Sequence, residues 1–191
     1  MNLNINLNLS RKVKIAAGAI IIASLAATAS VYAAITPNKY PLAPIYEPEF
    51  YGSPSSSIAS AVALPASSAT FLTSGTTPAV INKDGKTIYE RYGDTEAQGT
   101  SILQNIEKQL KEQGLSLKDV IYLRVYIAPD AAKGGKFDYE GWFKAYAKYF
   151  NTKDNPTKTA RSTVGVASLV SPDWLIEIEA VAAYPSQHNQ D

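Results

Sequence analysis

Two segments of the chain carry hydrophobic residues at the spacing of an amphipathic helix. The first follows Thr95, which with Gln98 resembles a capping box, and Gly114 lies where a glycine commonly ends a helix. The second runs from about residue 139 to residue 150, and we expect its aromatic side to face the core. The apolar stripe of the first is Ile102, Leu103, Ile106 and Leu110, and that of the second is Trp142, Phe143, Tyr146 and Phe150.

Strands are predicted on both sides of these helices, at residues 69–73, 120–127, 160–166 and 174–183. Within 120–127, one face carries only aliphatic residues, while the other carries Tyr122, Arg124 and Tyr126. The turn at 82–85, which contains Asp-Gly, predicts a further hairpin between 80–81 and 86–89. Residues 171–173 are expected to turn the chain between the last two strands, which would then form a terminal hairpin.

This order of elements predicts an α+β fold: a single mixed β-sheet with two helices on one face. Two helices cannot cover both faces of a sheet, so the other face is expected to be exposed and apolar. Such a face is usually buried against another subunit. The pattern therefore predicts self-association.

The N-terminal segment has the order of charges and apolar residues that is typical of an export signal. Arg11, Lys12 and Lys14 precede an apolar run at 15–27, and Val31-Tyr32-Ala33 offers a cleavage site. Residues 1–33 are thus predicted to be a signal peptide, which places the mature protein in the periplasm or outside the cell and off the membrane. The alternative is an uncleaved anchor, because the apolar run continues to about residue 35 and could just span a bilayer.

Three regions follow the predicted signal peptide. Residues 34–56 form a Pro- and Tyr-rich arm and linker, whose four prolines favour an extended chain and whose aromatic rings predict docking on the domain or on a neighbouring subunit. A sharper version has Tyr46 or Tyr51 reaching a binding cleft. Residues 57–185 form the folded α+β domain, and residues 186–191 are a polar tail.

Composition excludes several classes of function. The whole chain has 18 Lys and Arg against 17 Asp and Glu, and residues 1–33 hold three of the positive charges and no negative one, which leaves 15 against 17. This balance argues against a nucleic-acid partner. There is no Cys, and the single His is His188 in the tail, so we expect no disulfide, no thiol or histidine catalysis, and no thiolate or His-rich metal site.

Two charged residues lie inside predicted strands. Arg161 is surrounded by apolar and small residues, a costly position unless the guanidinium meets an anion, and it can hold a carboxylate through two parallel hydrogen bonds. Glu177 shares a strand face with Glu179, and a carboxylate in a cleft can orient or deprotonate water. The residues alone leave open an internal Arg161–Glu pair, or charges that point to solvent. The register of the expected hairpin would decide whether Arg161 and Glu177 share a face.

Several motifs together resemble those of the Rid (YjgF) family. They are Phe71-Leu72-Thr73-Ser74-Gly75, the helix at 101–106, the strand at 119–127, Ala160-Arg161-Ser162-Thr163-Val164, and Ile176-Glu177-Ile178-Glu179-Ala180. The resemblance covers roughly residues 57–184. It implies a chorismate-mutase-like fold and a homotrimer with its sites in the clefts between subunits, without metal or organic cofactor.

The same resemblance implies hydrolysis of small 2-imino or enamine acids to 2-keto acids and ammonia. Arg161 would hold the substrate carboxylate, and Glu177 would position or activate the attacking water. Ser74, Gly75 and Thr163 would line the substrate pocket.

The chain also departs from the family pattern. No Tyr is found near Ile58, where the family has a pocket Tyr; Phe143 stands where it has an Asn; and Thr163 replaces a Cys. These changes leave open whether the chain is an enzyme. The alternative is a non-catalytic trimeric module that binds small carboxylate ligands, with Arg161 as its anion clamp. The ribonuclease activity that has been linked to the family fits poorly with an acidic mature chain that has a His only in its tail.

Overall fold

The computed structural model describes residues 45–185, and we treat this part of the chain alone. The predicted signal peptide, residues 34–44 of the predicted arm and the polar tail, including His188, lie outside the described residues. Within 45–185, no helix combines the length and the apolar character needed to cross a bilayer.

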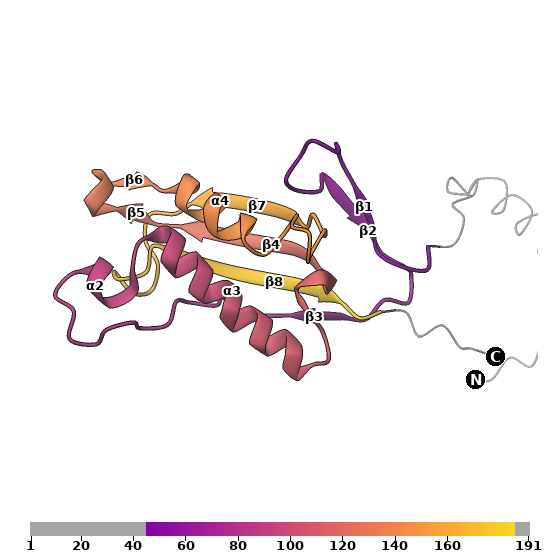
Figure 1. Cartoon of the computed structure of the whole chain (residues 1–191), viewed down its shortest axis with the longest axis horizontal. Coiled ribbons are helices and arrows are strands. Elements are labelled where there is room, and N and C mark those ends of the chain that lie inside the picture. The colour runs from indigo at the N-terminus through magenta and orange to yellow at the C-terminus, as the bar shows by residue number, and fades with distance from the viewer. Residues whose placement is uncertain (1–44, 186–191) are drawn as a thin grey trace, which may run out of the picture. The chain divides into compact units, whose positions relative to one another are not determined.

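A four-stranded mixed sheet forms the centre of the fold (Figure 1). Its spatial order is β3-β8-β4-β7, in which β8 runs antiparallel to both β3 and β4, and β4 runs parallel to β7. The strands are β3 (Thr70–Leu72), β4 (Val120–Ile127), β7 (Ala160–Gly165) and β8 (Ile176–Ala183). All four predicted strands are therefore present, in one mixed sheet.

The predicted terminal hairpin is wrong, because β4 lies between β7 and β8 and pairs with both. β4 is the most apolar strand, and its buried residues alternate along its length. A central place satisfies its backbone groups on both sides, which a buried strand requires. The segment between β7 and β8 thus crosses the end of β4 and is not a tight turn.

Two helices cover one face of the sheet, as predicted: α3 (Thr95–Glu112) and α4 (Tyr139–Ala147). They approach closely at Gly99, where a Cβ atom would lie 3.2 Å from the Cβ of Ala145. The core lies between the helices and the sheet. Its largest fully buried side chains include Trp142, Tyr146, Phe150, Ile102, Leu103, Ile106, Leu110, Leu123, Ile127, Ile176 and Ile178.

The start of α3 differs from the prediction. Asp94 is the N-cap, and its carboxylate accepts a hydrogen bond from the amide of Ala97, while Thr95 and Gln98 are buried. The Gln98 side chain instead binds the segment before β8, where its amide oxygen accepts a hydrogen bond of 2.8 Å from the backbone N–H of Leu175. The predicted end of the helix is confirmed: Gly114 has a φ of 73°, in the left-handed region that favours glycine.

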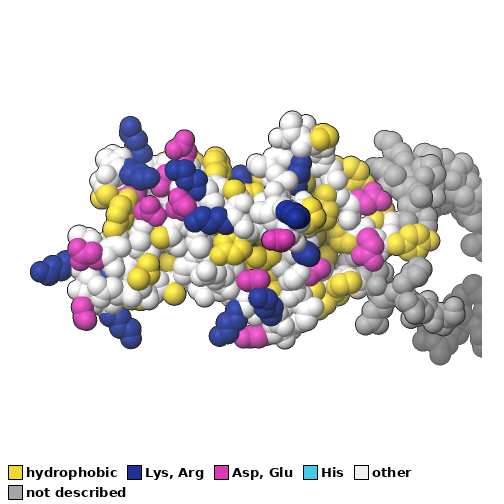
Figure 2. Space-filling model, viewed as in Figure 1, with side chains coloured by type: hydrophobic (Ala, Val, Ile, Leu, Met, Phe, Trp, Pro, Cys, Tyr) yellow, Lys and Arg dark blue, Asp and Glu magenta, His cyan; other side chains and the backbone are white. Residues whose placement is uncertain are grey.

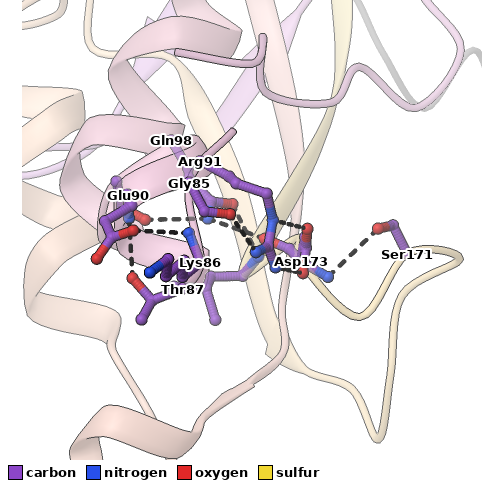
Figure 3. A network of polar contacts seen from close by, with 10 residues as sticks. Gly85, Lys86, Thr87, Glu90, Arg91, Gln98, Ser171 and Asp173 are labelled. Atoms are coloured by element: carbon purple, nitrogen blue, oxygen red, sulfur yellow. Dashed lines mark hydrogen bonds and ion pairs between the residues drawn. The ribbon is translucent and has the colours of Figure 1, made fainter. Parts of the chain in front are cut away.

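The hairpin predicted at 80–89 is also wrong, because Ile88–Tyr92 form a short helix, α2. Thr87 caps it by accepting a hydrogen bond from the amide of Glu90, and the Glu90 carboxylate accepts one from the amide of Lys86 (Figure 3). These two bonds satisfy the amides of Glu90 and Lys86, which a strand would have used in its ladder. Capping chemistry therefore outweighs the Asp-Gly turn signal.

Two small two-stranded sheets and two short 3-10 turns complete the described chain. Glu49–Tyr51 (β1) pairs with Ala61–Ala63 (β2), so part of the predicted arm is a strand. Pro129–Asp130 (β5) pairs with Lys136–Phe137 (β6). Short 3-10 turns lie at Leu117–Asp119 and Ala131–Lys133.

The sheet face opposite the helices is polar at its centre, contrary to the prediction of an apolar face. Arg124 donates to Glu179 at 2.7 Å, and the Tyr126 hydroxyl donates to the same carboxylate. Each of these side chains pairs with one on the neighbouring strand, which the alternation along a single strand could not reveal. Apolar residues remain at the borders of this face, where Leu72 is 64% exposed.

Candidate active site

Arg161 lies on β7, one of the two edge strands of the sheet, and points toward the helices. Its partner on β4 is Leu123, a fully buried residue of the helix-covered face. The guanidinium carbon lies 4.5 Å from the ring centre of Tyr146, 4.8 Å from that of Phe143 and 5.5 Å from that of Trp142. Helix α4 thus supplies three aromatic rings that stabilise the cation through their π faces.

The charge of Arg161 has no anionic partner among the described residues. Its Nη1 atom is buried without a hydrogen bond, and so is the hydroxyl of Thr163, two residues further along the same face. Burial lowers the pKa of Arg161. Because a guanidinium does not lose its proton in proteins, it remains a buried cation that an incoming anion would stabilise.

Tyr146 does not supply that anion. Burial raises the pKa of its phenol to about 12, even though the nearby Arg161 acts in the opposite direction. The hydroxyl is therefore neutral near pH 7, and it donates a hydrogen bond to the carbonyl of Ser57 at 3.3 Å. The rings around Arg161 form an uncharged box that is complementary to a cation but leaves its hydrogen bonds unmade.

Glu177 points to the other face of the sheet. Its partner on β4 is Tyr126, and it shares this face with Glu179, as predicted. Glu179 is engaged by Arg124, whereas Glu177 has no hydrogen bond or ion pair with any residue of 45–185. Of the two strand carboxylates, only Glu177 is available to a ligand.

Ser74 and Gly75 lie beside Glu177. The segment after β3 continues along β8, where Thr76 and Ile178 exchange two backbone hydrogen bonds of 2.8 and 3.1 Å. A Cβ atom at Gly75 would overlap the Glu177 carboxylate and lie 2.7 Å from its Cδ atom. Glycine is therefore required here for the carboxylate to keep its position against the backbone.

A groove of about 510 Å³ extends from this segment along α3. It is lined by Ser74, Gly75, Thr76, Thr77, Asn105, Lys108, Gln109 and Glu112. The groove gives Ser74 and Gly75 access to solvent, and Glu177 is not among its lining residues.

The predicted site residues thus form two separate groups in one subunit. Arg161 and Thr163 lie on the helix-covered face, while Glu177, with Ser74 and Gly75 beside it, lies on the open face. The internal Arg161–Glu pair that the sequence left open does not form. The question of the hairpin register does not arise, because β4 lies between β7 and β8. Leu123 of β4 is in register with Arg161 on one side and with Ala180 on the other, so Arg161 is aligned with an alanine and not with a glutamate.

Sequence reasoning missed the aromatic box. The pattern assigned the four aromatic residues of the predicted stripe to the core, and Trp142 and Tyr146 are indeed buried, but Phe143 is exposed. Its place next to Trp142, off the i, i+4 line of the core stripe, could have signalled a separate role. Within 45–185, no group of three or more His, Cys, Asp or Glu residues is placed so that it could hold a metal ion.

Comparisons with known proteins agree with this architecture. The model of the family described as Endoribonuclease L-PSP matches residues 56–184, more than half of the chain. Two relatives, a RutC family protein from Pyrococcus horikoshii and the 3-aminoacrylate deaminase RutC of Acinetobacter baylyi, are each 38% identical over 90 residues. Each match covers 47% of this chain and 63% of the relative, so the chain spans less than two thirds of the length of these proteins.

The fold is also found among solved structures. The Rid family protein YyfB of Yersinia pestis superimposes with a TM-score of 0.54 at 24% identity, over 72% of this chain and 99% of that protein. At this identity the likeness concerns the fold alone, a mixed sheet with helices on one face. The family match over residues 56–184 shows that this chain belongs to the Rid (YjgF) family.

Proposed function

We propose that this protein hydrolyses small 2-imino or enamine acids to 2-keto acids and ammonia in an exported compartment. The observation that carries the proposal is the Arg161 guanidinium, which is buried against three aromatic rings and has an unpaired Nη1 atom. A small carboxylate is the anion that its planar fork fits best.

The reaction needs a held carboxylate and one activated water. An enamine acid first takes a proton on the carbon next to C2 and loses one from nitrogen, which gives the imine. Water adds its oxygen to C2 of the imine while the nitrogen gains a proton, which gives a carbinolamine. The C2–N bond then breaks, ammonia leaves with a second proton from the carbinolamine hydroxyl, and the 2-keto acid remains. In this scheme Arg161 fixes the carboxylate, the Thr163 hydroxyl contacts it, and Glu177 orients the water and relays its proton.

The site requires two subunits. Arg161 and Glu177 point from opposite faces of one sheet, so they can act on one substrate only if different copies supply them. We propose a homotrimer in which Arg161 and Thr163 of one subunit face Ser74, Gly75 and Glu177 of the next. Three equivalent clefts arise if every subunit offers one group to each neighbour.

Enamine acids are included because of the named relative. The Acinetobacter protein is a 3-aminoacrylate deaminase, and its substrate is an enamine acid that carries a carboxylate. Its nitrogen is on C3, so the same hydrolysis takes place at C3 and gives a 3-oxo acid, whereas an enamine with its nitrogen on C2 gives a 2-keto acid. That carboxylate is the chemical feature that Arg161 is suited to bind. Ribonuclease activity is not favoured, because Figure 2 shows acidic and basic side chains interspersed on the displayed face of the described residues, with no extended basic surface there.

A second candidate is non-catalytic binding of small carboxylates by the same trimer. Phe143 favours it, because an exposed aromatic ring against Arg161 adds contact area for a ligand and no group that could take part in hydrolysis. Both candidates predict binding that depends on Arg161, and only the first predicts release of a keto acid.

The test is an assay of keto-acid release from freshly generated 2-iminopropanoate and 2-iminobutanoate, run beside calorimetric binding of the product keto acids. We expect wild-type protein to accelerate release, and Arg161→Ala and Arg161→Lys to lose about 2–4 kcal/mol of binding, because Lys cannot form the planar fork. Lys83→Ala, which removes an exposed charge from the turn at 82–85, serves as the control. Binding without release would leave the second candidate, and equal binding by wild type and both Arg161 variants would overturn both.

The exported location is tested separately by the intact mass of the protein recovered from the periplasm or the medium. We expect loss of about the first 33 residues, as the position of Ala33 predicts. A full-length, membrane-bound product would contradict the proposal.

A further inference from the structure

Three aromatic residues lie exposed on the helix-covered side of the sheet, close to its β7 edge. We call Phe137, Tyr139 and Phe143 the aromatic strip. Their exposed fractions are 39%, 37% and 44%, which is high for rings that a folded domain could have buried.

The strip begins at Arg161. The Phe143 ring lies 4.8 Å from the guanidinium carbon, and Tyr139 lies one helical turn before Phe143 on α4, so both project from the same side of that helix. The Phe137 ring is 6.0 Å from the Tyr139 ring. The three rings are therefore consecutive neighbours that lead away from the cation.

The far end of the strip is fixed by Gly165 of β7. A Cβ atom at this glycine would lie 2.9 Å from two atoms of the Phe137 ring, so the ring rests directly on the strand backbone. Arg161, Thr163 and Gly165 share one face of β7, and four residues of strand separate the first from the last by roughly 13 Å. The strip thus runs beside β7 from the guanidinium to Phe137, past the unpartnered Thr163 hydroxyl.

This arrangement places an anion clamp at one end of an exposed apolar surface. A ligand with both a carboxylate and a large apolar group can bind the clamp with the first and cover the strip with the second. A ligand whose apolar part is only a methyl group would leave the strip exposed to water. Aromatic rings stack on one another with an energy beyond that of simple burial. A ring on the ligand therefore gains more from the strip than an alkyl group of similar size.

We propose that the aromatic strip binds the side chain of the 2-imino acid whose carboxylate Arg161 holds, and that the protein prefers substrates with an aromatic side chain. The preference rests on the proposed function for its reaction, but it is a property of binding and can be measured without turnover. Phe143 is then a specificity-determining residue, since it contacts both the clamp and the ligand ring.

The test compares phenylpyruvate with pyruvate, the keto-acid products of an aromatic and a small substrate, by calorimetry on the mature oligomer. We expect wild type to bind phenylpyruvate at least about tenfold more tightly, and Phe143→Ala to lose most of that ratio. Val170→Ala removes an apolar side chain that is 91% exposed on the segment between β7 and β8, and it should keep the ratio. In turnover, the corresponding imines should differ in KM more than in kcat.

The outcomes separate the two proposals. Selective binding of phenylpyruvate without keto-acid release supports side-chain binding by the aromatic strip and contradicts the proposed reaction. Turnover with equal affinity for the two keto acids supports the reaction and overturns the strip. If a second subunit covers the strip instead, Phe143→Ala will weaken the oligomer in light scattering and leave the ratio unchanged, which also overturns the inference.

Discussion

Arg161 and Glu177 lie on different strands of one sheet and point to opposite faces of it. Leu123 of β4 is in register with Arg161 on one side, and Tyr126 of the same strand is in register with Glu177 on the other. Because residues of odd and even position on one strand face opposite ways, the two side chains cannot meet in one subunit. Any chemistry that uses both must therefore involve two copies of the chain.

Mixing two inactive variants tests this geometry. Arg161→Ala and Glu177→Ala are each expected to lose activity, whereas oligomers refolded from an equal mixture should regain it. If neighbouring subunits share each site in a trimer, random assembly restores about one site in four. Keto-acid release measured before and after co-refolding gives the result, and a mixture as inactive as its components would show that one subunit supplies both groups.

Gly75 should be essential for the position of Glu177 but not for the fold. In Gly75→Ala, the new Cβ meets only the far end of the flexible Glu177 side chain, which can swing away at little cost. We expect a change in unfolding free energy below about 1 kcal/mol. The kcat should nevertheless fall by about 10²-fold or more, as expected for a displaced general base.

Glu177→Gln is the matched comparison for that variant. It keeps the shape of the side chain, removes its basicity and should reproduce the loss of kcat with keto-acid binding retained. If Gly75→Ala remained active while Glu177→Gln did not, the contact between the glycine and the carboxylate would have no functional role.

The sheet and its two helices could be predicted because their signals are local. Alternation in 120–127 and the apolar stripe of 102–110 specify which side of each element is buried, and both agree with the structure. The order of the strands could not be predicted in the same way. Whether β7 pairs with β8 or with β4 depends on how all three share the sheet, and a turn-like segment at 171–173 was a misleading local cue.

The candidate site was predictable in residue type and not in arrangement. A strand Arg among small residues is a candidate for anion binding, so Arg161 could be singled out from chemistry, although the residues alone left open an internal pair or a charge that points to solvent. Its aromatic box comes from α4, a different element, and the pairing of Glu179 with Arg124 crosses from β8 to β4. Such contacts between elements decide which charge stays free, and no single strand pattern contains them.

The ion pair between Arg91 and Asp173 predicts a pH-dependent stability. Arg91 donates two hydrogen bonds of 2.6 Å to the Asp173 carboxylate and a third to the carbonyl of Gly85, and Gln98 donates to the Asp173 carbonyl (Figure 3). These contacts connect α2 and α3 to the segment that leads into β8. The hydrogen bonds from Arg91 lower the pKa of the Asp173 carboxyl.

A lowered pKa in the folded state means that the pair stabilises the fold fully above the unfolded pKa of about 3.9 and loses this contribution as the pH falls through the folded value. Asp173→Asn should therefore be less stable than wild type at pH 7, and its stability should fall less steeply below about pH 4. Urea midpoints of wild type and of Asp173→Asn, measured from pH 7 to pH 3, show how steeply the stability of each protein falls with pH. Asp84→Asn, at an exposed carboxylate of the turn at 82–85, is the control, and equal slopes for wild type and Asp173→Asn would contradict the prediction.

The oligomer should depend on the apolar border of the open sheet face. Leu72 is 64% exposed on β3 and in register with Val181 of β8, beside the polar centre that Arg124 and Glu179 form. A charge placed there would have to be buried without a partner if a second subunit covers this face, and an unpaired buried charge is strongly destabilising to an interface. Leu72→Glu is thus expected to reduce the mass in light scattering from about three subunits to one, and to abolish keto-acid release together with the shared site. Val170→Glu makes the same change at a 91% exposed position between β7 and β8 and should remain trimeric. A Leu72→Glu protein that stays trimeric and active would show that this border of the sheet lies outside the interface.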